Sequence, residues 1–345
     1  MDFIPESLVA RVKNFVRRYA IACILCLCIV VFALADSSLI SVRNIRNILS
    51  NAAPLLLSSA AMALCLFEGY IDLCAGSCAV FAAVIAGSFM QSADTAGRFF
   101  SALPPMPLFI ALPAVLVLFF VIGMCNGFFI KRLFLPPWAA TLGTGALLSA
   151  LTRVYLYDTN SSLKVLEGFT RSYNLFGTGY IGASPVYSIP LPLIFSFAVF
   201  TALLVVLKIF LPDLDLPPLH KDRPLLWPAQ PKSLTLKQTM LLYGIVSSLF
   251  ALSGLMVSAR SGSASAFSGT EFIMPALTVC VIASLSFFGG TGNWTALVVS
   301  VFIFSGFTYA ADFIGVNRFL SSAFCALILL ISTAADVRTR RKNAL

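Results

Sequence analysis

Charged residues and histidines are scarce in this sequence, and their scarcity excludes most enzyme chemistry. Only 11% of the 345 residues are charged and there is a single histidine, His220, whereas ordinary soluble domains carry about 25% charged residues. His220 lies among prolines, and with no second histidine the chain cannot form a metal or acid–base site built on histidines. We therefore expect no enzyme activity, no catalytic residue and no metal ion.

Two further kinds of site are missing. The phosphate-binding pattern G-x-x-x-x-G-K-[ST] occurs nowhere, and the glycine-rich run FFGGTGN at 287–293 lacks its lysine and its hydroxyl residue. The nine cysteines lie almost all inside apolar runs, where they act as small hydrophobic residues and not as a disulfide framework. The chain is therefore expected to bind no cofactor, and any ATP hydrolysis must be carried out by another polypeptide.

Long apolar runs are what the sequence has in abundance, with 59% hydrophobic residues. About 20 apolar residues cross the hydrocarbon core of a bilayer as a helix, and many runs approach that length. We predict an all-α, polytopic membrane protein with about ten transmembrane helices in a single transmembrane domain over 1–345. The expected spans are 19–35, 52–68, 74–91, 106–130, 138–157, 188–210, 239–257, 272–288, 294–313 and 317–335.

Two of these spans admit a second interpretation. Residues 19–35 follow a basic segment and end in Ala33-Leu34-Ala35, which imitates a secretory signal and its cleavage site. A signal's apolar region usually has about 7–15 residues, so the greater length here favours an uncleaved first span. The run 138–157 is rich in Gly and Thr and carries Arg153, so it is either a span or a re-entrant segment.

The basic residues give the expected orientation. The net charge of +9 comes from lysines and arginines that cluster at the two ends and in one loop, a pattern that fits the surface of a lipid membrane and not a nucleic-acid partner. Cytoplasmic segments carry an excess of Lys and Arg. We therefore predict cytoplasmic N and C termini, with a tail at 1–18, a proline-rich loop at 211–238 and a basic tail at 336–345.

Two segments are expected on the outer surface. The stretch 37–50 places Leu39, Val42, Ile45 and Leu49 at helical spacing against polar residues, which predicts a short helix lying on the membrane surface. The long polar loop 158–187 is of a length that is usually functional or disordered.

Four motifs carry a resemblance to a known family. They are YIDLCAGS at 70–77, GMCNGFFIKRLFLPPWAATLGTGAL from Gly123, GTGYIGASPV from Gly177, and FFGGTGN from Phe287. In this order and spacing they resemble the permease subunits of ATP-binding-cassette importers for simple sugars, the ribose, galactose and xylose group. The resemblance covers roughly 40–200 and 245–340.

The resemblance implies a transport subunit in the cytoplasmic (inner) membrane of a prokaryote. Its partners would be a dimer of ATP-binding subunits, an extracytoplasmic solute-binding protein, and a second copy of the permease or a homologous one. The Ile-Asp-Leu form of the first motif is similar to the sugar branch, which also includes autoinducer-2 permeases. A nucleoside permease and an ion-coupled secondary carrier remain alternatives, because broken helices also occur in such carriers.

One departure from the family concerns coupling to the ATPase. The family's inner loop contains a short docking helix with Glu-Ala-Ala and Gly landmarks, and the loop 211–238 has neither but holds six prolines. A heterodimer, in which a partner permease carries the regular docking helix, is therefore a hypothesis for this chain.

The motifs also select the candidate site residues. For the substrate pathway or its structural support, these are Asp72, Gly76, Ser77, Asn126, Gly127, Thr141 and Thr144. Asp72 has two interpretations, a helix cap that accepts backbone N–H groups or a direct contact to sugar, and capping is favoured. Asn126 either bonds a sugar hydroxyl or bridges two helices. The expected ATPase-facing residues are Lys131, Arg132, Lys221 and Arg223.

Overall fold

The computed structural model describes residues 19–157, 165–182, 188–210, 234–266, 272–286 and 293–344, and most of them are helical. The helices are α2 (Ala20–Ala35), α3 (Val42–Phe67), α4 (Ala75–Phe89), α5 (Leu108–Arg132), α6 (Pro137–Leu156), α7 (Arg171–Thr178), α8 (Leu191–Phe210), α9 (Leu236–Ser261), α10 (Ile273–Ile282), α11 (Trp294–Phe313) and α12 (Arg318–Ala344), with a 3-10 turn, η1 (Ser37–Ile40). The all-α prediction is confirmed.

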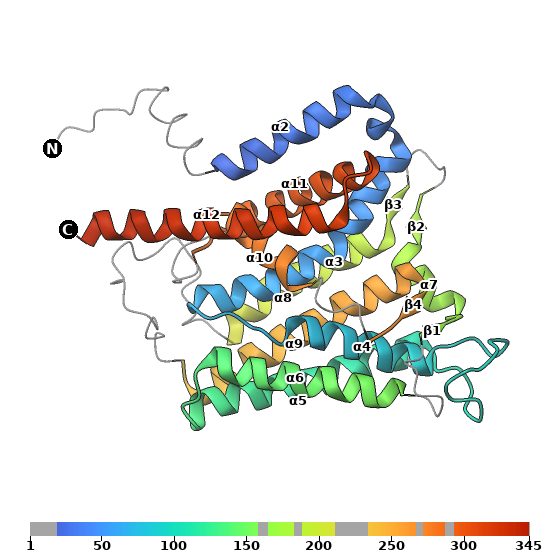
Figure 1. Cartoon of the computed structure of the whole chain (residues 1–345). Coiled ribbons are helices and arrows are strands. Elements are labelled where there is room, and N and C mark those ends of the chain that lie inside the picture. The colour runs from blue at the N-terminus through green and yellow to red at the C-terminus, as the bar shows by residue number, and fades with distance from the viewer. Residues whose placement is uncertain are drawn as a thin grey trace.

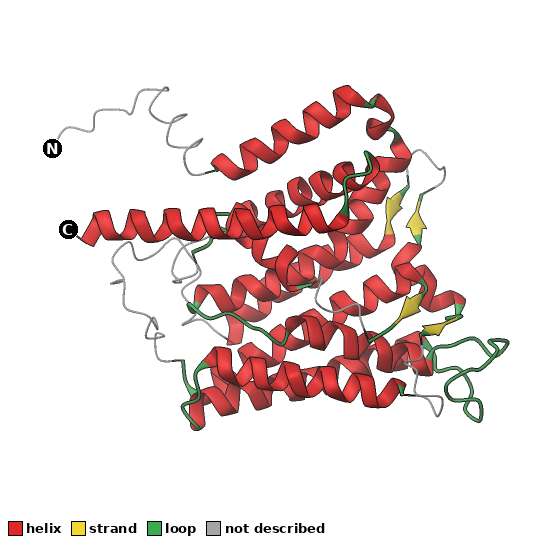
Figure 2. Cartoon of the chain, viewed as in Figure 1, coloured by secondary structure: helices red, strands yellow, loops and turns green. Residues whose placement is uncertain are grey.

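Most helices run side by side along one axis, as Figure 1 shows. The start of α2, the end of α12 and the α5–α6 turn all lie at the same end of the bundle. Four two-residue strands lie at the opposite end (Figure 2): β1 (Leu166–Glu167) pairs with β4 (Ser263–Ala264), and β2 (Tyr180–Ile181) pairs with β3 (Ile189–Pro190). We refer to these as the inner end and the outer end, following the orientation predicted from the basic residues.

Helix α9 is the centre of the bundle and packs against α3, α4, α5 and α7. It begins with a capping box, in which Thr235 and Gln238 satisfy each other's backbone N–H groups, and it ends at Gly262 in the left-handed conformation. In its most apolar window, 72% of the residues are buried inside the protein. Helix α5 is much more exposed than α9, because only 22% of its most apolar window is buried. Most of its surface can therefore contact lipid or another subunit.

Each of the ten expected spans overlaps a helix, but ten membrane crossings are not established. Five described helices are long and apolar enough to cross a membrane on their own, namely α3, α5, α8, α9 and α11. Helices α2 and α4 and the apolar part of α12 are shorter. Helix α10 ends at Ile282, and not at the expected 288. Its 10 residues rise only about 15 Å, which is half of a hydrocarbon core.

The prediction of a separate surface helix at 37–50 is wrong. Val42 begins α3, which continues without a break through Pro54 to Phe67. The four expected apolar residues do not share one environment, because Leu39 is buried while Val42 and Ile45 are each 43% exposed, and Asn44 between them is buried. Asn44 accepts a hydrogen bond from the hydroxyl of Tyr309 on α11 at 2.8 Å. Inside a membrane, polar groups bridge neighbouring helices and apolar groups face lipid. Asn44 therefore links α3 to α11, and the exposed Ile45 is placed to face lipid.

Candidate functional site

Helix α4 starts inside the bundle, and this places the first motif at membrane depth. After α3 ends, the chain turns at Gly69, whose φ of 76° is left-handed, and continues without regular structure to Cys74. Figure 1 shows this connection running from the inner end of α3 back among the other helices. Non-helical backbone is tolerated at this depth only where protein or a water-filled cavity surrounds it.

Asp72 is fully buried in this connection. One carboxylate oxygen, Oδ1, accepts the backbone N–H of Cys74 at 2.8 Å, just before α4 begins at Ala75. The other oxygen, Oδ2, has no hydrogen-bond partner within the described part of the chain. Asp72 thus satisfies one backbone donor at the start of α4, as a capping residue does, and keeps a second acceptor for a water, a ligand or a proton.

The second motif meets the first across α5 and α6. The hydroxyl of Thr144 donates to Oδ1 of Asn126, and Nδ2 of Asn126 donates to the sulfur of Cys74 at 3.5 Å. The hydroxyl of Thr141 accepts the backbone N–H of Leu73 at 3.2 Å. Three segments that lie far apart in the sequence are therefore joined by side-chain hydrogen bonds.

Ser77 lies about one turn further along α4 than Cys74 and forms a separate pair with Ser149. Its hydroxyl lies 2.9 Å from that of Ser149 on α6, and both side chains are only half-buried. Gly76, in the first turn of α4, is buried. We call the group formed by Asp72, Cys74, Ser77, Asn126, Thr141, Thr144 and Ser149 the polar cluster. It is built from uncharged hydrogen-bonding groups around one buried carboxyl.

Gly127 lies outside this cluster, on the face of α5 that contacts α9. A Cβ atom at Gly127 would come within 2.6 Å of the Cα of Met240. At Gly123 it would come within 2.1 Å of the carbonyl oxygen of Tyr243. These two glycines allow two helix backbones to approach closely, as small residues spaced by four do in membranes.

The apolar pattern of α9 did not single out two polar side chains, Tyr243 and Ser247, that lie beside Gly123 of α5. Tyr243 is almost completely buried, and its electrostatic environment includes Asp72 and Cys74. Its hydroxyl and that of Ser247 have no hydrogen-bond partner among the residues described here. Both lie inside a long apolar span, so nothing in the local pattern distinguishes them from packing residues.

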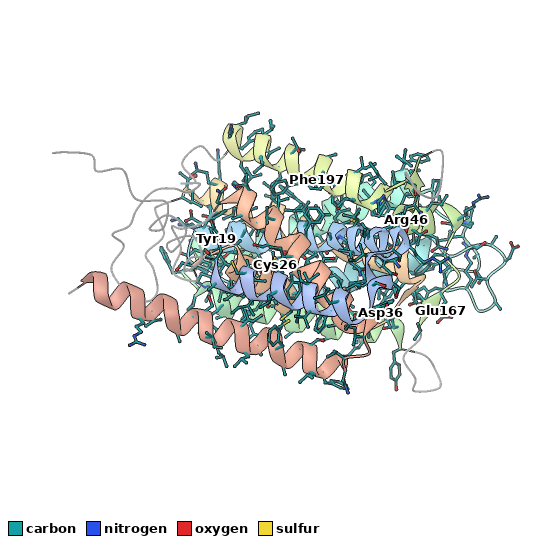
Figure 3. All side chains as sticks on the ribbon, turned by 90° about the horizontal axis from the view of Figure 1, so that it is seen from above. Tyr19, Cys26, Asp36, Arg46, Glu167 and Phe197 are labelled. Atoms are coloured by element: carbon teal, nitrogen blue, oxygen red, sulfur yellow. The ribbon has the colours of Figure 1, made fainter. Side chains whose placement is uncertain are left out.

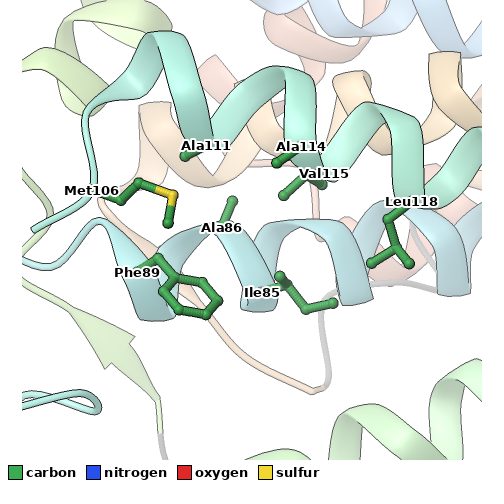
Figure 4. A pocket seen from close by; sticks show the side chains of 8 residues that line it. All are labelled: Ile85, Ala86, Phe89, Met106, Ala111, Ala114, Val115 and Leu118. Atoms are coloured by element: carbon green, nitrogen blue, oxygen red, sulfur yellow. The ribbon is translucent and has the colours of Figure 1, made fainter. Parts of the chain in front are cut away.

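A cavity between α4 and α5 is not a sugar site. It has a volume of about 270 Å³ and lies between α4 and α5, near Phe89 and Met106 (Figure 4). All eight side chains that line it are apolar. A sugar would lose its hydrogen bonds to water here and gain none in return, so the polar cluster is the better candidate.

The expected ATPase-facing residues are placed in part. Lys131 and Arg132 occupy the last turn of α5 at the inner end, where Lys131 is half-buried and Arg132 is exposed. Lys221 and Arg223 lie outside the described residues, as does most of the proline-rich loop.

The outer end carries a second set of polar residues. Nη1 of Arg46 donates to the hydroxyl of Ser188 at 2.9 Å, and the guanidinium lies 5.1 Å from the ring centre of Tyr180. Figure 3 shows Arg46 toward the end of the bundle opposite Tyr19. Arg260, at the end of α9, has a buried Nη1 without a hydrogen-bond partner in the ranges that the structure covers. Two guanidinium groups therefore lie toward this end of the bundle.

Comparison with known proteins gives relatives along nearly the whole chain. The chain is 24% identical over 341 residues to the galactose/methyl galactoside import permease protein MglC of Escherichia coli (strain K12), covering 94% of this chain and 95% of the relative. It is 25% identical over 324 residues to the ribose import permease protein RbsC of Haemophilus influenzae, covering 93% and 92%.

A third relative imports a different solute. The autoinducer 2 import system permease protein LsrD of Yersinia pestis (strain Pestoides F) is 23% identical over 347 residues, which cover 95% of each chain. No family model matches the sequence, and no solved structure is significantly similar to it. The resemblance carried by the four motifs is confirmed, because the chain is similar along nearly its whole length to import permeases for galactose, ribose and autoinducer 2.

Proposed function

We propose that the chain is the transmembrane subunit of an ATP-binding-cassette importer in a prokaryotic inner membrane, and that it conducts a simple sugar inward. An extracytoplasmic binding protein delivers the sugar, and a separate dimer of ATP-binding subunits hydrolyses ATP. The full-length similarity to galactose and ribose import permeases carries this proposal. A second permease, either another copy or a homologous chain, completes the pathway.

The chemistry of the polar cluster supports a neutral, hydroxyl-rich solute. Its hydroxyl, amide and thiol groups carry no fixed charge and both donate and accept hydrogen bonds of modest strength, which suits a sugar that must bind and then be released. The same groups suit the furanosyl signal autoinducer-2, and the similarity to LsrD keeps that solute as the second candidate.

The decisive experiment is uptake into proteoliposomes. The chain is purified with the ATPase and binding protein that it assembles with, and radiolabelled ribose, galactose and autoinducer-2 are offered separately. We expect uptake that requires ATP inside the vesicles and that continues when ionophores collapse the ion gradients. Uptake that runs without ATP and stops with ionophores would instead establish an ion-coupled carrier.

For the outer end, we propose that the exposed surface around Arg46 receives the solute-binding protein. Arg46 is held by Ser188 and Tyr180 rather than by a carboxylate, so it retains capacity for an acidic group on a partner.

We expect Arg46→Glu to weaken binding of the solute-binding protein by about tenfold or more, because like charges then meet across the interface. Surface plasmon resonance with the permease complex in nanodiscs measures this affinity at two salt concentrations. The control is Arg98→Glu, which changes an arginine in the separate 90–106 loop. Equal affinities for both variants and the unaltered chain would place the docking surface elsewhere.

A further inference from the structure

The turn between α5 and α6 exposes large apolar side chains at the inner end of the bundle. Phe134 is 86% exposed, Leu133 is 54% exposed and Trp138 is 53% exposed. Directly before them come Lys131 and Arg132, which form no ion pair with any described residue. An apolar patch of this kind, with basic residues at its edge, indicates an interaction surface.

The backbone of this turn is held in an unusual conformation. Phe134 has a φ of 56°, which is left-handed and disfavoured for a residue with a Cβ atom. The N–H groups of Leu133 and Leu135 both donate to the carbonyl of Phe129, at 3.2 and 3.3 Å, and so fix the turn. The strained conformation directs the ring of Phe134 away from the protein, and such strain commonly marks a functional position.

The length of α5 argues against burial of Phe134 in lipid. About 20 residues suffice to cross the hydrocarbon core, and α5 has 25, from Leu108 to Arg132. Lys131 and Arg132 therefore lie at the level of the headgroups, and Phe134 follows them at the tip of the turn. Figure 1 shows this turn at the end of the bundle where α12 ends, which is the end predicted to be cytoplasmic and the ATPase side under the proposed function.

The turn is also connected to the polar cluster by short hydrogen-bonded steps. The hydroxyl of Thr141 donates to the carbonyl of Pro137 at 2.9 Å and accepts the N–H of Leu73. Asn126, two turns before the end of α5, binds Cys74. Helix α5 ends at this turn and α6 begins there, and both helices contribute residues to the polar cluster. A displacement of the turn would therefore move both helices relative to Asp72 and Cys74.

We infer that the α5–α6 turn, with Phe134 at its tip, docks into an apolar pocket with an acidic rim on the ATP-binding subunit and couples that subunit to the polar cluster. This inference rests on the proposed function and names a contact for one of its partners. Charge complementarity with Lys131 and Arg132 specifies the rim, and the exposed rings of Phe134 and Trp138 specify the pocket.

Photocrosslinking tests the contact directly in the assembled complex. Benzoylphenylalanine is introduced at position 134 and, as a matched control, at 109, where Phe109 is 77% exposed in the first turn of the same helix at the outer end. We expect the probe at 134 to crosslink to the ATPase and the probe at 109 to crosslink only to lipid. Phospholipid adducts alone at 134 would overturn the inference in favour of a membrane anchor.

A functional test separates docking from folding. Phe134→Gly removes the ring and also relieves the left-handed strain, so the variant should fold at least as well as the unaltered protein while ATP-driven uptake falls about tenfold or more. Phe109→Gly should leave uptake unchanged. Unaltered uptake in Phe134→Gly would contradict the coupling role. If the unaltered chain assembles with its ATPase and transports, failure of these variants to show an effect refutes only this inference and leaves the proposed function intact.

Discussion

Gly123→Ala is expected to prevent α5 from closing against α9 and to leave little folded permease. The added methyl group would lie 2.1 Å from the carbonyl oxygen of Tyr243 and 2.7 Å from the hydroxyl of Ser247. A backbone carbonyl inside a helix cannot rotate away, so the two helices must separate. Overpacking in a core typically costs 1–3 kcal/mol and occasionally more, and here it also disturbs the central helix of the bundle.

The measurement is the melting temperature of the purified protein in detergent, together with the fraction that elutes as a single peak in size exclusion. Gly143→Ala is the matched control, because it makes the same change inside a helix where no heavy atom lies within 4 Å of the new Cβ. The control should be neutral or slightly stabilising, since alanine favours helix by about 1 kcal/mol over glycine. A Gly123→Ala protein as stable as Gly143→Ala would mean that α5 does not contact α9 in this way.

Two substitutions at Asp72 should have opposite consequences for folding. Asn retains an oxygen that can accept the N–H of Cys74, whereas Leu leaves that N–H buried without a partner. An unsatisfied buried donor costs about 1–3 kcal/mol. We therefore expect Asp72→Asn to fold and Asp72→Leu to be clearly destabilised, as measured by thermal unfolding in the same detergent.

Transport by Asp72→Asn then tests the charge itself. If Asp72 serves only to begin α4, ATP-driven uptake should survive in this variant. Loss of uptake in a protein that still folds would show that the carboxyl acts in transport, through the oxygen Oδ2 that has no partner in the described chain. A change from ATP dependence to ion dependence is not expected in either variant.

Hydropathy located the long apolar helices, because apolar length is a property of each segment alone, but it predicted neither α7 (Arg171–Thr178) in the polar loop 158–187 nor the start of α3 at Val42. The motifs also selected residues that meet in space, since Asp72, Asn126 and Thr144 belong to one hydrogen-bonded group. Their roles remain predictions, with Gly127 placed against α9 instead of in that group. Hydropathy failed where a residue's environment depends on another helix, as for Asn44, which is buried because Tyr309 binds it.

Tyr243 and Ser247 could not be found from sequence either, because their environment also depends on neighbouring helices. Each is a single polar residue in an apolar span, and its importance comes from the helices that surround it. The interior start of α4 was equally invisible, because a run of apolar residues does not reveal whether a helix begins at the membrane surface or within it.

The broken connection before α4 has a consequence for biogenesis. Helix α4 has 15 residues and rises about 22 Å, so it is too short to hold itself across the bilayer, and the backbone at 68–74 exposes polar groups that lipid cannot satisfy. Helices α5, α6 and α9 pack against α4 and shield these groups from lipid. Since the ribosome makes α9 more than a hundred residues after α4, the nascent chain must hold α4 in a provisional position, and the polar cluster forms only after most of the protein has left the ribosome.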